Sequence, residues 1–214
     1  MGKINTSIFG AVSGKVGNVI GASWKSVAYL RGKAAKVKDS NSEEQQAQRA
    51  IFKTVVKFVK PMKAFLNIAY KGVETNMTPY NSVTKRILTE CIIKGDEGAE
   101  IDYSKVLVSK GGMPVLNDIT ATCSAGKVSL SWSDKSDVSE TKISGDDNIM
   151  PLVFNLSKQQ AEFTTKQFKR SDKSGDLELP ESWKGDSILV YAGTKDKKNK
   201  DASDSIFLGE FVLA

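Results

Sequence analysis

Histidine is missing from this chain of 214 residues, and only two cysteines are present. Without histidine the sequence cannot supply a Ser-His-Asp triad, an imidazole general base or the ligands of most zinc sites. Two cysteines are too few for a disulfide framework, and no apolar run reaches the length of a membrane span. These absences predict a protein that is not an enzyme and that uses no cofactor or metal. No small-molecule substrate is evident.

Acidic residues are missing from residues 1–38, where seven cations stand. Residues 1–71 carry 13 Lys and Arg against three acids, whereas the rest of the chain carries 18 against 22. This asymmetry indicates either contact with a polyanion or head-to-tail packing of copies of the chain, although a solvated basic arm would have the same composition. The seven cations are Lys3, Lys15, Lys25, Arg31, Lys33, Lys36 and Lys38.

Glycine recurs within the same basic segment, at Gly10, Gly14, Gly17 and Gly21. Steps of four, three and four would align these glycines on one face of a helix, but each interior glycine costs a helix roughly 1 kcal/mol relative to alanine. The β-branched residues between them favour the alternative, which is a set of extended runs over 8–12, 16–23 and 24–31. In that case the glycines serve turns, bulges or close backbone approaches, and we predict a glycine-rich extended segment.

The cations and aromatic residues of this segment are the candidate contact residues. Trp24 and Tyr29 alternate with cations, so the segment offers both phosphate-neutralising charges and stacking surfaces. A phosphate loop is not indicated, because only three residues separate Gly10 from Gly14. We predict contact with nucleic acid or with a neighbouring subunit at Lys3, Lys15, Trp24, Lys25, Tyr29, Arg31, Lys33, Lys36 and Lys38.

Two amphipathic helices are expected after the basic segment. Ser42 and Gln45 match a capping box, and apolar residues at steps of three and four form a stripe over residues 47–69. Pro61 should kink or split this helix before its end. A second helix is expected over about 79–94, with a proline at its first position.

From residue 101 onward the pattern changes to short alternating runs separated by turn residues. About seven such strands with mostly short connections are typical of an antiparallel β-sandwich. The predicted fold class is therefore α+β, with the basic arm and the helical pair in residues 1–100 and the sandwich in residues 101–214. The predicted strands are 105–109, 116–123, 127–133, 150–156, 161–168, 186–194 and 205–213.

Five acids gather in the sequence after the third predicted strand, but they do not form a convincing site. They lack the spacing of a calcium loop, and nothing around them indicates the aromatic-lined cleft of a glycosidase. We interpret them as acids of a solvated loop, and the charged run 195–201 as a solvated hairpin loop. The five are Asp134, Asp137, Glu140, Asp146 and Asp147.

The second half of the chain resembles a fibronectin type III or immunoglobulin-like sandwich. SLSW at 129–132 looks like the second strand of that fold, with Trp132 as its core tryptophan. LPESWKGDSILVYAGT at 179–194, which contains Tyr191, is similar to the approach to its sixth strand. The resemblance implies interaction or scaffolding rather than chemistry.

The whole chain resembles a domain-of-unknown-function family of Bacteroidota and their phages and mobile elements. No established function comes with this resemblance, which implies an architecture and a phage or prophage setting. The residues that carry it are SGKVGNVIGASWK (13–25) with Arg31, QQAQRAIFKTVVKF (45–58), IDYSKVLVSKGG (101–112) and SDSIFLG (203–209).

Two functional hypotheses follow. The first is a non-enzymatic structural protein that assembles with copies of itself through its N-terminal arm, as in a phage virion or a related particle. The second is a nucleic-acid-binding protein of a mobile element that contacts the phosphate backbone without sequence specificity. Because the first residues are polar and lack the apolar core of a signal peptide, we expect the protein in the cytoplasm or in a virion.

Overall fold

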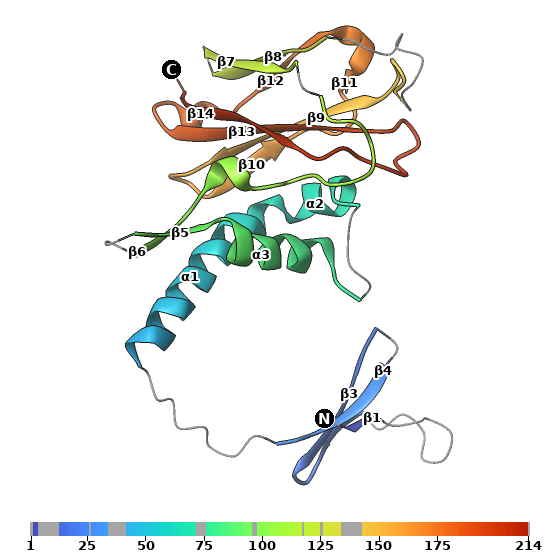
Figure 1. The fold of residues 1–214 in the computed structure, drawn as a ribbon, viewed down its shortest axis with the longest axis vertical. Coiled ribbons are helices and arrows are strands. Elements are labelled where there is room, and N and C mark those ends of the chain that lie inside the picture. The colour runs from blue at the N-terminus through green and yellow to red at the C-terminus, as the bar shows by residue number, and fades with distance from the viewer. Residues whose placement is uncertain are drawn as a thin grey trace. The chain divides into compact units, whose positions relative to one another are not determined.

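The chain divides into two compact units, Met1–Gln45 and Gln46–Ala214. The structure is a computed structural model that describes residues 2–3, 13–25, 27–33, 42–71, 76–95, 98–116, 118–124, 126–133 and 143–213 (Figure 1). The sequence-based division at residue 100 places the helical pair with the basic arm. In the structure the helices instead belong to the unit that contains the sandwich.

The N-terminal unit contains a four-stranded antiparallel sheet with the order β1-β4-β3-β2. The interpretation of the glycine-rich segment as extended is therefore confirmed over 14–32, and the glycine-striped helix is wrong for this region. Gly17 has a φ of +57° and opens the two-residue turn between Val16 and Val19, a backbone conformation that glycine adopts without steric cost. The predicted run 8–12 lies outside the described residues. The strands are β1 (Gly2–Lys3), β2 (Gly14–Val16), β3 (Val19–Trp24) and β4 (Val27–Gly32).

The first predicted helix is confirmed, including its start and its break. The backbone N–H of Gln45 donates to Ser42 Oγ at 3.3 Å, one half of the expected capping box. Pro61 lies in a 3₁₀ turn that divides the helix, because proline lacks the N–H that a continuous α-helix needs. The elements are α1 (Glu43–Val59), the 3₁₀ turn η1 (Lys60–Met62) and α2 (Lys63–Ala69).

The second predicted helix is shorter than expected. It forms α3 (Pro79–Glu90), where Thr78 Oγ1 accepts a hydrogen bond from the N–H of Asn81 at 3.2 Å. The chain then makes a small hairpin of β5 (Ile92–Gly95) and β6 (Gly98–Ile101) instead of continuing as a helix to residue 94. β-branched Ile92 and Ile93 favour a strand, and this preference decides the boundary.

The remainder forms an antiparallel β-sandwich, which confirms the predicted α+β class. One sheet has the order β12-β8-β7, and the other has the order β10-β9-β13-β14 with β11 also paired to β9. The first, second and sixth strands thus face a sheet built from the third, fourth, fifth, seventh and eighth, an immunoglobulin-like arrangement. The strands are β7 (Thr120–Ser124), β8 (Lys127–Ser131), β9 (Asn148–Asn155), β10 (Gln160–Phe163), β11 (Phe168–Lys169), β12 (Ser174–Glu178), β13 (Ser187–Lys195) and β14 (Ile206–Val212).

The sandwich differs from the sequence prediction at three places. Residues 161–168, predicted as one strand, divide into β10 and β11, which pair with different parts of β9. Residues 105–109, predicted as a strand, form the end of the 3₁₀ turn η2 (Tyr103–Lys105) and an irregular segment whose Val106 and Val108 are buried. The N–H of Val108 donates to the Ser205 hydroxyl at 2.9 Å, so a side chain supplies the partner that a strand would have supplied. β12 was not predicted, because its sequence SGDLE has no apolar alternation beyond Leu177.

The sheet that contains β9 and β13 is the middle layer of the second unit. Alternate residues of β9 point to opposite faces, so Leu152 and Phe154 pack toward the helices whereas Ile149 and Val153 pack toward the other sheet. Figure 1 shows α1, α2 and α3 on one face of this sheet and β7, β8 and β12 on the other. Both faces of the central strands are therefore covered.

Phe58 of α1 joins the helical layer to the middle sheet, and its replacement tests that layer. Its ring centroid lies 4.7 Å from that of Phe154 and 5.3 Å from that of Tyr103. We expect Phe58→Ala to lower the free energy of unfolding by about 3–5 kcal/mol, measured by urea denaturation, because it leaves a cavity. Phe52→Ala is the matched control, since Phe52 lies on the same helix and is 52% exposed. That variant should change stability by less than about 0.5 kcal/mol, and equal losses in the two variants would contradict the packing described here.

Candidate functional site

The strand register of the N-terminal sheet brings four of the nine predicted contact residues onto one face. Lys15, Ile20 and Arg31 stand opposite one another in a single row across β2, β3 and β4. Residues opposite each other in antiparallel strands share a face, as do residues two apart along a strand. Tyr29 and Trp24 therefore lie on the same face as Lys15 and Arg31. We call these residues, Lys15, Trp24, Tyr29 and Arg31, the basic-aromatic face.

The opposite face of the same sheet is small and apolar. Gly14, Gly21 and Leu30 form one row across the strands, and Val16, Val19 and Gly32 form the next. We call these six residues the glycine face. Val16 is 66% exposed and Val19 is 41% exposed, so the two valines expose apolar surface in the described structure. A face with several glycines permits close approach of another backbone.

The other predicted contact residues lie at turns or strand ends, are described only in their backbone, or fall outside the described residues. Lys25 lies in the turn between β3 and β4 with a φ of +45°, and Lys33 follows β4, where its N–H donates to the Asn18 carbonyl at 2.7 Å. Lys3 belongs to β1, where its backbone pairs with Tyr29. Gly10, Lys36 and Lys38 fall outside the described residues. β2, β3 and β4 contain no acid, so nothing within these strands neutralises their cations.

A second group of cations was not predicted from the sequence. Five lysines of the second unit line a cavity of about 700 Å³ where β9 begins and β11 and β13 end, beside Ile68 of α2. We call it the lysine cavity. One acid, Asp146, also lines it, which leaves an excess of four positive charges in its wall. The lysines are Lys166, Lys169, Lys195, Lys197 and Lys198.

Strand register places two of these lysines in one row, on either side of β9. Lys169 of β11 and Lys195 of β13 both pair with Asn148 of β9, so the three side chains lie in one row on one face of the sheet. Lys195 is 3% exposed. The sequence interpretation of 195–201 as a solvated loop is therefore wrong for its first residue, although residues 197–200 are exposed.

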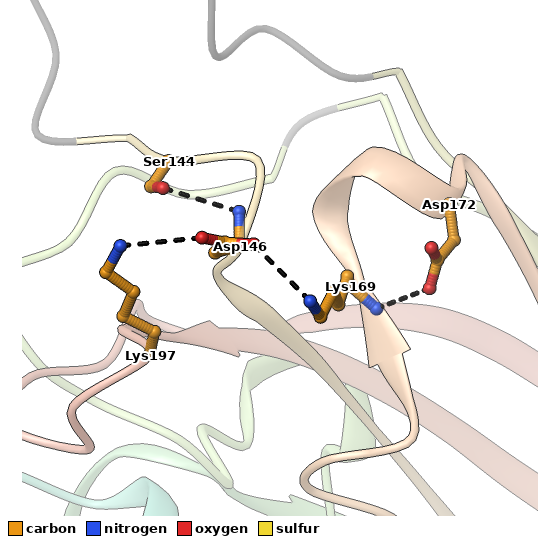
Figure 2. Close-up of polar contacts among 5 residues, drawn as sticks. All are labelled: Ser144, Asp146, Lys169, Asp172 and Lys197. Carbon is orange, nitrogen blue, oxygen red and sulfur yellow. Dashed lines mark hydrogen bonds and ion pairs between the residues drawn. The ribbon is translucent and has the colours of Figure 1, made fainter.

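Asp146 holds two of the lysines at the rim of the cavity. Its Oδ1 lies 3.4 Å from Lys169 Nζ and its Oδ2 lies 3.4 Å from Lys197 Nζ, as Figure 2 shows. Hydrogen bonds from Lys169 and then from Lys197 hold the pKa of Asp146 below its ordinary value. The N–H of Asp146 donates to Ser144 Oγ at 3.3 Å, and the N–H of Lys169 donates to Asp172 Oδ2 at 2.7 Å. The rim is thus fixed by backbone contacts and closed by two long ion pairs.

The neighbouring acids accept hydrogen bonds from backbone N–H groups and do not pair with the lysines. Asp147, expected in a solvated loop, is 3% exposed and accepts a hydrogen bond from the N–H of Ser144 at 2.8 Å. Asp196 accepts from the N–H of Asp201 at 3.1 Å, and Asp201 accepts from the N–H of Gly112 at 2.9 Å. These carboxylates shape the loops around the cavity and leave most of its positive charge uncompensated.

Lys195 is electrostatically strained by its surroundings. Burial lowers the pKa of Lys195, and the positive charges of Lys166 and Lys71 lower it further. Among the residues that the structure describes, no carboxylate lies within ion-pair distance of Lys195, and Asp196 acts on it only through space. No local sequence pattern predicts this arrangement, because the lysines come from two segments about 30 residues apart.

Comparison with known proteins places the chain in a family. The model of a family of unknown function (DUF6266) matches residues 11–209, so the chain belongs to that family. The match includes residues of both compact units. Among curated proteins none matches.

One solved structure is similar to part of the chain. It is the solution structure of the fn3 domain of human contactin 1, which is 15% identical and has a TM-score of 0.32. The similarity covers 50% of this chain and 83% of that domain.

Two further findings concern only the residues described. No helix in them is long and apolar enough to span a bilayer. No group of three His, Cys, Asp or Glu side chains in them is arranged to hold a metal ion.

Replacing Lys195 by methionine tests the strain on this residue. The lowered pKa means that the unfolded chain binds more protons than the folded chain between the two pKa values, so folding is penalised while Lys195 is charged. We expect Lys195→Met to raise the free energy of unfolding at pH 7, measured by urea denaturation. The gain over the wild type should shrink as the pH approaches the ordinary lysine value of 10.5.

The charged groups that act on Lys195 in this test are Lys166, Lys71 and Asp196. Lys197→Met is the matched control, because Lys197 is exposed and forms only one long ion pair. That variant should change stability by less than about 0.5 kcal/mol at either pH. If the Lys195→Met protein were less stable than the wild type at pH 7, the claim that charged Lys195 destabilises the fold would be wrong.

Proposed function

We propose that the protein is a non-enzymatic structural protein that assembles with copies of itself through its N-terminal unit. The observation that supports this most is the glycine face, where Val16 and Val19 are exposed on a small separate sheet. Fully burying one such side chain contributes roughly 1.5–3 kcal/mol. A small sheet also needs an apolar face packed against something for stability. A neighbouring copy would provide that cover.

The edges of the N-terminal sheet favour the same partner. In the described sheet β2 pairs with β3 on one side and with no described strand on the other. An unpaired edge presents N–H and C=O groups in a row, which a strand from another chain can complete. Lys15 is the only charged side chain of β2, so the edge carries little protection against such pairing.

Charge supports packing between copies as well. Residues 1–71 hold an excess of ten cations, whereas residues 72–214 hold an excess of four acids. A basic region of one copy would therefore be attracted to the acidic region of the next. The phage or virion-like particle as the setting, and the cytoplasm or virion as the location, rest on the resemblance to phage and mobile-element proteins given above.

Nucleic-acid binding is the second candidate, and the basic-aromatic face favours it. Lys15 and Arg31 can neutralise phosphates on a surface where Trp24 and Tyr29 can stack on bases. Single-strand binding proteins combine cations and aromatic rings in this way without reading sequence. The two faces of one sheet thus correspond to the two hypotheses, and substitutions on each face can separate them.

Substitutions on the glycine face test self-assembly. We expect the wild type to form large regular assemblies at modest salt, measured by light scattering after size exclusion and by electron microscopy. Val16→Ser with Val19→Ser should abolish these assemblies, because polar side chains remove the apolar surface that the contact buries. Deletion of residues 1–38 should leave a folded protein that no longer assembles. If the deletion variant formed the same assemblies, the N-terminal unit would not be the contact between copies.

Substitutions on the other face test nucleic-acid binding. We expect Lys15→Ala with Arg31→Ala to weaken binding of a single-stranded oligonucleotide and to make the slope of log affinity against log salt shallower by about 1.4, since each lost phosphate contact removes about 0.7. Val16→Ser with Val19→Ser is the matched control and should bind the oligonucleotide like the wild type. Binding that is lost equally in both double variants would indicate a damaged sheet and would contradict the division between the faces.

A further inference from the structure

The lysine cavity is built entirely from residues of the second unit, so its role is independent of the N-terminal sheet. Its wall brings five lysines together against one aspartate. Like charges held this close repel one another, and burial of Lys195 adds a desolvation cost. A cluster of like charges lowers the stability of the folded protein. Such clusters are typical of binding sites, where a ligand of opposite charge compensates the repulsion.

We propose that the lysine cavity binds a small molecule that carries several phosphate groups. Lysine is a common phosphate ligand because its compact ammonium group acts as a point charge with three donors. Asn148, Thr165 and Asn199 also line the cavity and add amide and hydroxyl donors for further phosphate oxygens. The wall contains donors for at least two phosphate groups at separate positions.

The size of the cavity limits the ligand. Pockets of roughly 300–1,000 Å³ hold ligands of drug or cofactor size, and this cavity falls within that range at about 700 Å³. Ile68 supplies apolar surface beside the cations, which suits a phosphorylated organic molecule as well as an inorganic polyphosphate. A continuous groove for a polynucleotide backbone would need cations along a line, whereas these converge around one hollow.

Asp146 occupies the position that a ligand phosphate would take. Its carboxylate lies between Lys169 and Lys197 at 3.4 Å from each and is 55% exposed, so both ion pairs are long and hydrated. Such exposed pairs contribute little to stability. A phosphate group carries more charge than a carboxylate and displaces it at little cost. Lys195, which is buried, and Lys166, which is exposed, then hold a second phosphate.

Titration calorimetry of the full-length protein with sodium tripolyphosphate tests the proposal. We expect one site per chain at low salt. Lys195→Met, and separately Lys166→Ala with Lys169→Ala, should each weaken binding at least tenfold, because charge-assisted contacts are lost. Lys184→Ala removes the same charge from an exposed position at the other end of β13 and should bind like the wild type. Thermal denaturation of each variant confirms that loss of binding is not loss of fold.

A gain of binding provides the sharpest outcome. Asp146→Asn removes the competing carboxylate and frees both lysines, so the affinity for tripolyphosphate should rise several-fold. Sulfate at matched ionic strength should bind at least tenfold more weakly than tripolyphosphate, and a 20-nucleotide single strand should not compete for the site. The proposal is overturned if the wild type shows no binding, if Lys184→Ala weakens binding as much as Lys195→Met, or if Asp146→Asn has no effect. Competition by the oligonucleotide would assign the cavity to nucleic acid instead. Because the N-terminal faces are intact in all of these variants, the result is independent of the assembly test.

Discussion

Burial of β9 and β13 on both faces is the constraint on which the second unit depends. A strand pair covered on one side only could alternate apolar and polar residues. Residues 149–154 of β9 and 188–193 of β13 contain no charged residue, because helices cover one face and a second sheet covers the other. Phe58 fills the helical side of this layer against Phe154. At one end of the middle sheet, Asn148 of β9 pairs with Lys195 of β13. These two polar residues follow the apolar part of the strands, and both line the lysine cavity. The cavity thus lies at the end of the middle sheet, beyond the apolar residues that pack against the helices and the second sheet.

The N-terminal sheet follows the opposite rule. Its strands are paired by hydrogen bonds, yet the valines of the glycine face remain exposed and no apolar residue of this unit belongs to either core cluster of the described chain. Hydrogen bonds between strands contribute little net stability in water when no apolar face is buried. The second unit, in contrast, buries two apolar clusters, one on each face of its middle sheet.

Local rules predict much of this fold, and long-range pairing accounts for the rest. Pro61 divides its helix and Ser42 caps it, because both effects act within one turn of the chain. The acid-free composition of residues 1–38 singled out Lys15 and Arg31, but their shared face follows from register that composition does not contain. Residues 105–109 were wrongly predicted as a strand. Their alternation reflects the burial of Val106 and Val108, but the N–H of Val108 donates to a serine hydroxyl and not to a neighbouring strand. Lys195 was misplaced because its burial depends on strands that begin 47 residues earlier in the chain.

Net charge along the sequence is a poor guide to where positive potential is concentrated in the folded protein. The first 71 residues hold the excess of cations, yet the lysine cavity lies in the part of the chain that is acidic overall. Screening limits the reach of a charge to roughly 10 Å at moderate salt, so distant acids do little to compensate Lys195 or Lys166. Asp196, the acid that acts on Lys195, accepts hydrogen bonds from backbone N–H groups of its own loop, and Asp146 pairs with Lys169 and Lys197 instead. A local field of this kind arises from topology, because strands from separate segments deliver their terminal lysines to the same edge of the sheet.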